Sequence, residues 1–340
     1  MHVTVKSYIL LVLSITCLFM SWQGISAPSE INYVNAETRY SPAQNNNYVL
    51  NQAAPDISGA YLNIPAANQP VIDTQSSFPE RWLSDRILGG DRLDVVSVNS
   101  QVIVAVLDTG IDSEHEDLIG TVINEINLTE SPETGDIHGH GTHIAGIITA
   151  EVDNELGIDG IAPDCLLLNV KVADDKGRCR ASALVEGIIW SVDHGAHIIN
   201  ISIEIREYSL ALKEAIDYAW ENGVVVIAAA GNDGSDVSVF PAGYENCISV
   251  TALKDEIDLA PLANYGDWID VAAPGYKVYS TLPGNTYGYK HGTSFAAAYV
   301  TGLAAEIYPT IKDTNADGQV NDEIRDLLLE LCNFDLPHWD

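Results

Sequence analysis

The strongest candidate nucleophile in this chain is Ser294, which lies in the stretch His-Gly-Thr-Ser-Phe-Ala-Ala-Ala from His291 to Ala298. A Gly-Thr pair precedes the serine and small apolar residues follow it, which predicts a helix with the serine at its positive end. A serine hydroxyl is a weak nucleophile by itself. It needs a base within reach and a third group that orients the base.

Two upstream stretches offer these groups. Asp108 lies in the stretch Val-Leu-Asp-Thr-Gly-Ile-Asp, and His140 lies in His-Gly-His-Gly-Thr-His. In such a triad His140 takes the proton of Ser294 and returns it to the leaving amine, while Asp108 fixes the histidine tautomer and stabilises the imidazolium. The alternative interpretation is an ordinary Asp-Thr-Gly turn and a histidine that caps a helix.

Three motifs resemble those of the subtilisin-like serine proteases, the subtilases. They are Asp-Thr-Gly from Asp108, His-Gly-Thr-His from His140 and Gly-Thr-Ser-Phe-Ala-Ala from Gly292. Each motif alone is weak, but the order Asp, His, Ser is the order of subtilisin. The resemblance runs from about Phe78 to about Leu331.

The resemblance implies further site residues. The stretch Ala228 to Gly234 is similar to the family segment that carries the oxyanion-hole asparagine. By this resemblance Asn232 donates its side-chain amide to the tetrahedral oxyanion, together with the backbone N–H of Ser294. A Gly-Asn turn after a buried strand is the alternative.

The histidines at positions 138, 140 and 143 also suggest a zinc cluster. The His-Glu-x-x-His pattern that supplies a general-base glutamate is absent, which weighs against it. In the resemblance His143 is structural and lies one helical turn below the base.

A structural calcium site is implied by two more segments. His115 to Leu118 resembles a family segment whose aspartate, here Asp117, binds calcium, and residues 152–158 resemble the loop that completes the site. Oxygen ligands of this mixture suit calcium, although a simple acidic turn is the alternative. The expected ligands are Asp117, Val152, Asn154, Leu156 and Ile158.

A second acidic loop, Asp313 to Gly318, begins like an EF-hand loop. The closing position is Ile324, with Glu323 one residue early, so the bidentate ligand is misplaced. A turn before a helix with Val320, Ile324, Leu327, Leu328 and Leu331 on one face fits equally well.

The substrate-binding segments depart from the family pattern. The expected substrate-binding residues are Ser202, Glu204, Gly231 and Val239. Glu204 and Ile205 stand where the family usually has glycines that permit close backbone approach, and Val239 stands where a glycine often lies deep in the primary pocket. If Glu204 points into the cleft, it favours Lys or Arg in the substrate. If it points to solvent, it contributes little.

Five apolar runs predict buried strands, and helical patterns alternate with them. The runs are 102–107, 166–172, 197–203, 224–229 and 247–253; helical patterns follow His140, run through Ala183 to Ile188 and run through Leu212 to Ala219. This alternation predicts a doubly wound, mostly parallel α/β sheet with helices on both faces, and the site at the carboxyl ends of the strands.

The net charge of the chain limits the classes of partner that it can bind. There are 16 Lys and Arg against 48 Asp and Glu, a formal net charge of -32. This balance argues against nucleic acid as a partner, because phosphate binding needs Lys and Arg. It suits a secreted protein, a saline habitat, calcium binding or the steering of cationic substrates.

The N-terminal segment reads as an export signal. Lys6, the apolar run from Tyr8 to Met20 and the small residues up to Ala27 predict a signal peptide cleaved near Ala27. An uncleaved anchor is the alternative, but the run is shorter than the ~20 residues of a spanning helix. Residues 28–77 read as a linker or extension, and residues 78–340 as the catalytic domain.

The four cysteines outside the signal segment allow three complete pairings, and their spacing does not choose among them. Altogether we expect a secreted, monomeric serine endopeptidase that acts on polypeptides, with structural calcium and no catalytic cofactor. No stable membrane insertion is expected after signal cleavage. An esterase or peptide ligase is a variant of this reading, and a catalytically silent peptide-binding protein is the alternative from another class.

Overall fold

The computed structural model describes residues 101–256 and 258–332. The predicted signal peptide, the segment 28–77 and the start of the family resemblance near Phe78 lie outside the described residues. None of the described helices is long and apolar enough to cross a membrane.

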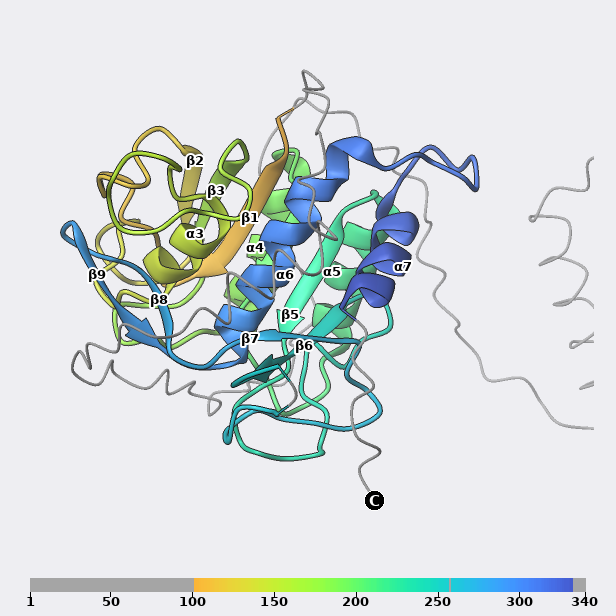
Figure 1. Cartoon of the computed structure of the whole chain (residues 1–340). Helices are drawn as coiled ribbons and strands as arrows, with labels where there is room; N and C mark the ends of the chain where they lie inside the picture. Colours follow the sequence, from red (N-terminus) through yellow and green to blue (C-terminus); the bar gives the residue numbers. More distant parts are fainter. Residues whose placement is uncertain (1–100, 257, 333–340) are drawn as a thin grey trace, which may run out of the picture. The chain divides into compact units, whose positions relative to one another are not determined.

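A seven-stranded parallel sheet forms the centre of the described region, in the order β2-β3-β1-β4-β5-β6-β7 (Figure 1). The residue ranges of its strands, in chain order, are Ile103–Asp108 for β1, Val122–Asn127 for β2, Leu166–Lys171 for β3, Ile198–Ile201 for β4, Val225–Ala229 for β5, Ile248–Leu253 for β6 and Val271–Pro274 for β7. A separate antiparallel hairpin pairs β8 (Val278–Leu282) with β9 (Thr286–Lys290).

Helices cover both faces of the sheet because successive strand residues point to opposite sides. Val104 and Val106 of β1 belong to the core on one face, and Ala105 and Leu107 belong to the core on the other. The first core is completed by α3 (Gly141–Thr149), α6 (Thr293–Ile307) and α7 (Asn321–Leu331), and the second by α4 (Ala181–Asp193) and α5 (Leu210–Glu221). A short 3₁₀ turn, Tyr308–Thr310, follows α6.

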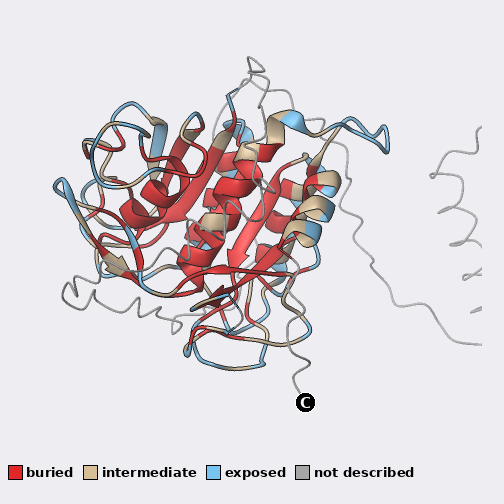
Figure 2. Ribbon diagram, viewed as in Figure 1, coloured by how far each residue is buried: buried red, intermediate tan, exposed pale blue. Residues whose placement is uncertain are grey.

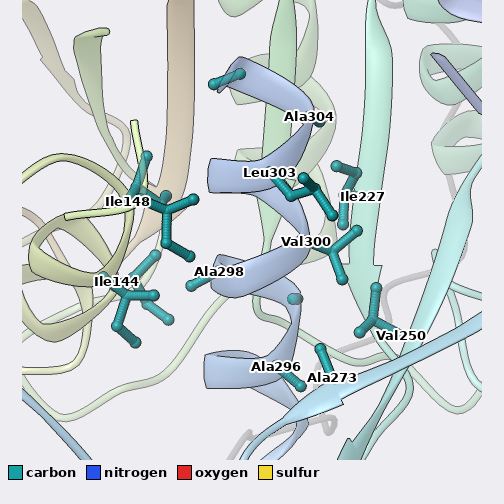
Figure 3. Close-up of a cluster of buried hydrophobic side chains, with 14 of the residues drawn as sticks. Ile144, Ile148, Ile227, Val250, Ala273, Ala296, Ala298, Val300, Leu303 and Ala304 are labelled. Atoms are coloured by element: carbon teal, nitrogen blue, oxygen red, sulfur yellow. The ribbon is translucent and has the colours of Figure 1, made fainter. Parts of the chain in front are cut away.

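Helix α6 lies at the centre of the first core. It packs against Ile144 and Ile148 of α3 on one side and against Ile227 and Val250 of the sheet on the other (Figure 3). Small residues such as Ala298 let these neighbours approach closely, and all but two residues of the helix are buried. Figure 2 shows that the central strands and most of α6 are buried, whereas α7 is partly exposed. The segment with the candidate nucleophile therefore begins a helix that is fixed by packing on several sides.

The doubly wound parallel fold predicted from the sequence is confirmed. All five predicted strands are present, with ends that differ by no more than two residues, and each of the three predicted helical segments lies within a helix. The strands β2 and β7 and the β8–β9 hairpin were not predicted. β2 is an edge strand with exposed residues, and β7 has four residues, so neither carries the long apolar run of a central strand.

The cysteines carry no disulfide framework in the described region. Cys165, Cys179 and Cys247 are free thiols, so none of the three complete pairings is present. Burial raises the pKa of the Cys165 thiol to about 12, which leaves it protonated and unreactive.

Candidate active site

Asp108 and His140 form a buried, directly bonded pair at the carboxyl end of β1. The Nδ1 atom of His140 lies 2.8 Å from Oδ1 and 2.9 Å from Oδ2 of Asp108. Burial acts to raise the pKa of Asp108, but the adjacent His140 and the Thr109 backbone N–H outweigh it and hold the pKa below its ordinary value. The aspartate is therefore a stable anion that orients the imidazole and leaves Nε2 for chemistry.

Ser294 occupies the first turn of α6, as predicted. The helix is preceded by Gly292, which has a φ of 152° and connects it to β9. Ser294 is buried, with 6% of its surface exposed. Its neighbour Phe295 packs against the ring of His140 with a centroid distance of 5.3 Å. The Ser202 hydroxyl lies 3.4 Å from the Ser294 carbonyl oxygen. The end of β4, the start of α6 and the His140 loop therefore meet at one place.

Asn232 is held with its amide nitrogen free to donate. Its Oδ1 atom accepts a hydrogen bond of 2.9 Å from the backbone N–H of Thr293, and the Thr293 hydroxyl also donates to it at 3.3 Å. That hydroxyl accepts in turn from the backbone N–H of Gly231 at 3.1 Å. Because Oδ1 is occupied, Nδ2 is the part of the Asn232 side chain left for a ligand.

Asp136 is a residue of the site that the sequence did not predict. One carboxylate oxygen accepts from the Thr109 hydroxyl at 3.0 Å and from the Gly139 backbone at 2.8 Å. The other accepts from the backbone and hydroxyl of Thr142 at 2.9 and 2.8 Å. Asp136 thus joins the turn after Asp108 to the loop that carries His140.

A buried lysine also lies near the Asp108–His140 pair. Lys290 ends β9, and burial lowers its pKa, while Asp136 and Asp108 oppose that shift. Burial also lowers the pKa of His138 and lowers that of His143 well below its ordinary value, in both cases reinforced by Lys290. The three histidines do not converge on one point, because His140 bonds Asp108 and the Nε2 of His143 lies 3.1 Å from the Gly288 carbonyl.

The predicted substrate-binding residues gather beside this centre. The backbone of Ile205 pairs with Phe240 through hydrogen bonds of 2.7 and 2.8 Å, which brings the segments after β4 and before Pro241 together. Val239 is buried, and Glu204 is half-buried with its carboxylate against Gly231. The side chain of Glu204 therefore does not extend freely into solvent.

The predicted calcium segments also come together. Asn154 contacts the buried carboxylate of Asp117, with 2.6 Å between Nδ2 and Oδ1, and the backbone nitrogen of Ile158 lies 3.4 Å from Oδ2. Asp117 is 1% exposed, yet none of the described Lys, Arg or His side chains forms an ion pair with it. Residues 101–256 and 258–332 contain no cluster of three His, Cys, Asp or Glu side chains suited to a metal, so a cation here would depend on amide oxygens.

The second acidic loop has the geometry of a turn before α7. The carboxylate of Asp313 accepts from the backbone of Ala316 at 2.6 Å and of Gly318 at 2.9 Å. Glu323 accepts from the backbone of Thr314 at 2.8 Å. Backbone amides thus bond both carboxylate oxygens of Asp313 and Oε1 of Glu323, whereas Oε2 of Glu323 has no hydrogen-bond partner among the described residues.

Comparison with known proteins agrees with this geometry. Residues 99–331, more than half of the chain, match the model of the subtilase family. The thermophilic serine proteinase of Bacillus sp. (strain AK1) is 44% identical over 213 residues, which cover 62% of this chain and 53% of that protein. Thermitase of Thermoactinomyces vulgaris is 40% identical over 204 residues, 59% of this chain and 72% of that protein.

Subtilisin DY of Bacillus licheniformis is 42% identical over 221 residues, 62% of this chain and 79% of that protein. The chain thus spans about half the length of the Bacillus AK1 proteinase and larger shares of the other two. The matched region contains every described element of the sheet and the segments that carry Asp108, His140 and Ser294. On the match to the family model and these identities, the chain belongs to the subtilase family.

Proposed function

We propose that this chain is a secreted serine endopeptidase that hydrolyses peptide bonds through an acyl-enzyme. Ser294 is the nucleophile, His140 the general base and acid, Asp108 the group that orients His140, and Asn232 the oxyanion donor. Ser202, Glu204, Gly231 and Val239 line the substrate cleft. Val239 fills space at the bottom of the primary pocket and disfavours large aromatic side chains.

The reaction proceeds in two halves. The Ser294 Oγ forms a bond to the scissile carbonyl carbon while its proton passes to Nε2 of His140, and Asn232 donates to the developing oxyanion. The tetrahedral intermediate collapses, the C–N bond breaks, and His140 gives its proton to the leaving amine. Water then attacks the ester with His140 as base, and Ser294 recovers its proton as the acid product leaves.

The observation that carries this proposal is the buried Asp108–His140 pair, which lies against the first turn of α6, where Ser294 is. A fluorophosphonate probe tests it, because such probes react with activated serines only. We expect the probe to label the purified protein stoichiometrically and to leave the Ser294→Ala variant unlabelled. Protein that has not been treated with the probe should cleave casein. Labelling without any peptide cleavage would favour an esterase, and the absence of both labelling and cleavage would favour a silent peptide-binding protein.

Calcium is proposed as a structural ion held by Asp117, Asn154 and the carbonyl groups of Val152, Leu156 and Ile158. The support is the buried carboxylate of Asp117, which needs a counter-charge and meets only neutral groups. Burial and the neighbouring carboxylates of Asp117 and Glu116 raise the pKa of Tyr287, so its phenol stays protonated and donates to Glu116 at 3.2 Å. The proposed ligand atoms are carboxylate, amide and carbonyl oxygens, as calcium prefers, and the Asn154 amide would turn to present Oδ1 in place of the Nδ2 that now faces Asp117.

We propose that the first 27 residues are a signal peptide that directs export, and that the mature protein is a monomer. N-terminal sequencing of protein recovered from the culture medium tests the cleavage near Ala27. An N-terminus at residue 1 in the cell-associated fraction would contradict it.

A further inference from the structure

Glu204 lies where the backbone is held firmly. It follows β4 by three residues, at the carboxyl edge of the sheet where Asn232 and Ser294 also lie. The paired backbones of Ile205 and Phe240 hold the next residue in place. The direction of the Glu204 side chain is therefore set by the fold and not by a mobile loop.

The carboxylate of Glu204 lies over the backbone that leads into the oxyanion donor. A Cβ atom added to Gly231, which has a φ of +95°, would come within 2.4 Å of Oε2 of Glu204. Only a glycine leaves room for the carboxylate here. The backbone N–H of Asn232 also interacts with it. The Glu204 carboxylate thus lies against the residue that precedes Asn232, the proposed donor to the substrate's carbonyl oxygen.

This carboxylate has no cationic partner in the described part of the chain. Arg206, whose charge acts on Glu204, instead forms an ion pair of 2.7 Å with Asp233 at the surface. Burial raises the pKa of Glu204, the Asp233 charge raises it further, and Arg206 opposes them. A partly buried anion without a counter-ion is unfavourable alone and is relieved by a cation supplied from outside.

The substrate places one side chain within reach. When the scissile carbonyl oxygen is at Asn232, the residue on the acyl side of the bond has its Cα one bond away from that carbonyl carbon. A side chain that passes Gly231 from there reaches Glu204. Beside Glu204 lie two buried apolar residues, Ile205, which is next in the chain, and Val239, which precedes the Phe240 that pairs with Ile205. A long, slender side chain with an apolar stem and a terminal cation fits such surroundings, as Lys and Arg side chains do.

We propose that Glu204 is a specificity-determining residue that selects Lys or Arg on the acyl side of the scissile bond. This inference rests on the peptidase function proposed above. It names the substrate class of that site: polypeptides cleaved after basic residues. The preference follows from an unmatched charge at one position and differs from the general attraction of an acidic protein for cationic peptides.

The test compares fluorogenic peptides that differ only in the acyl-side residue: Lys, Arg, Gln, Met or Glu. We expect the wild-type kcat/KM for Lys and Arg to exceed that for Gln at least tenfold. In Glu204→Gln, which keeps the size of the side chain, the Lys/Gln ratio should fall to threefold or less. In Glu204→Lys the order should reverse, with Glu preferred over Lys.

Glu186→Gln is the matched control, because it removes one exposed carboxylate of α4 with the same change of net charge. It should keep the wild-type Lys/Gln ratio. A second control peptide carries Lys four residues before the scissile bond, and its cleavage should not depend on Glu204. Fluorophosphonate titration gives the concentration of folded active sites in each variant.

The outcomes separate the two proposals. Active, labelled protein with no preference for Lys or Arg overturns this inference alone, as does a preference that survives Glu204→Gln. If Glu204→Gln lowers kcat/KM equally for all substrates, Glu204 has a structural role, and the inference is also overturned. If neither labelling nor cleavage of any peptide is seen, the peptidase proposal fails first.

Discussion

At the scale of single residues, the triad side chains are expected to act as one unit. Ser294→Ala, His140→Ala and Asp108→Ala should each lower kcat by about 10⁴–10⁶-fold, a range taken from the subtilisin triad itself and not from this structure. The double variants should lose no more than the worse single variant, because each group works only through the others. Steady-state kinetics on one peptide measures this. A Ser294→Ala protein with near wild-type turnover would refute the assignment.

Asp136 is expected to matter for both stability and turnover. Its carboxylate accepts four hydrogen bonds that tie the Asp108 turn to the His140 loop. Hydrogen bonds to a charged group contribute about 1.5–3 kcal/mol each, and these are not additive, so Asp136→Ala should destabilise the protein by roughly 2–4 kcal/mol. The turnover number should fall more than KM rises, because the pair loses its alignment.

Urea unfolding in the Ser294→Ala background measures the stability change without self-digestion, and kinetics on Asp136→Ala alone measures turnover. Asp164→Ala, at an exposed position, is the control and should change neither. Wild-type kcat in a stable Asp136→Ala protein would show that the pair is aligned by other contacts.

At the scale of elements, the loop before β3 and the segment around Asp117 are expected to be joined by calcium. An ion bound only by the folded protein stabilises it by RT ln(1 + [L]/Kd), about 2.7 kcal/mol at a hundredfold excess over Kd. Chelator should therefore lower Tm, and Asp117→Asn should shrink the difference between calcium and chelator. Calorimetry with Ser294→Ala protein measures both. Equal Tm values in calcium and chelator would contradict the site.

The contact between α3, β9 and α6 is expected to weaken in mild acid. His143 is fully buried there, beside Phe295 and the Gly288 carbonyl, and its pKa lies well below the ordinary value of 6.5, first because of burial. Since the unfolded chain binds the proton more readily, this contribution to stability is complete above pH 6.5. It is lost as the pH falls below that value.

The slope from one such group is at most about 1.4 kcal/mol per pH unit. Urea unfolding of Ser294→Ala protein between pH 7.5 and 5, with and without His143→Gln, measures it. Glutamine keeps a donor and does not titrate, so the variant should show the shallower pH dependence. Parallel curves for the two proteins would show that His143 is not the group responsible.

At the scale of the whole molecule, the formal net charge of -32 is expected to make stability depend on salt. Like charges repel in the compact state, and salt screens them over a Debye length of about 10 Å at 0.1 M. The Tm of calcium-saturated Ser294→Ala protein should therefore rise between 0.02 and 0.5 M NaCl. Sucrose of equal osmolality controls for solvent exclusion. A Tm that is constant or falls with NaCl would show that attractive ion pairs dominate.

The parallel sheet and the proposed catalytic groups could both be predicted from the order of the residues alone. The five central strands are buried on both faces, so their apolar runs are continuous and easy to recognise. Asp108, His140 and Ser294 lie in short motifs whose residue types follow from the chemistry. Edge strands such as β2 carry no such pattern, because solvent accepts polar side chains on them.

The polar groups that surround the proposed catalytic residues became apparent only from the folded chain. Asp136 and Lys290 lie 28 and more residues from Asp108 in sequence, and only the packing of the loops and of β9 brings them to the site. The direction of Glu204 was likewise open in the sequence, since a glutamate after a strand can point to solvent or inward. The pairing of Ile205 with Phe240 and the missing side chain of Gly231 turn it inward, because together they fix its backbone and leave space for its carboxylate.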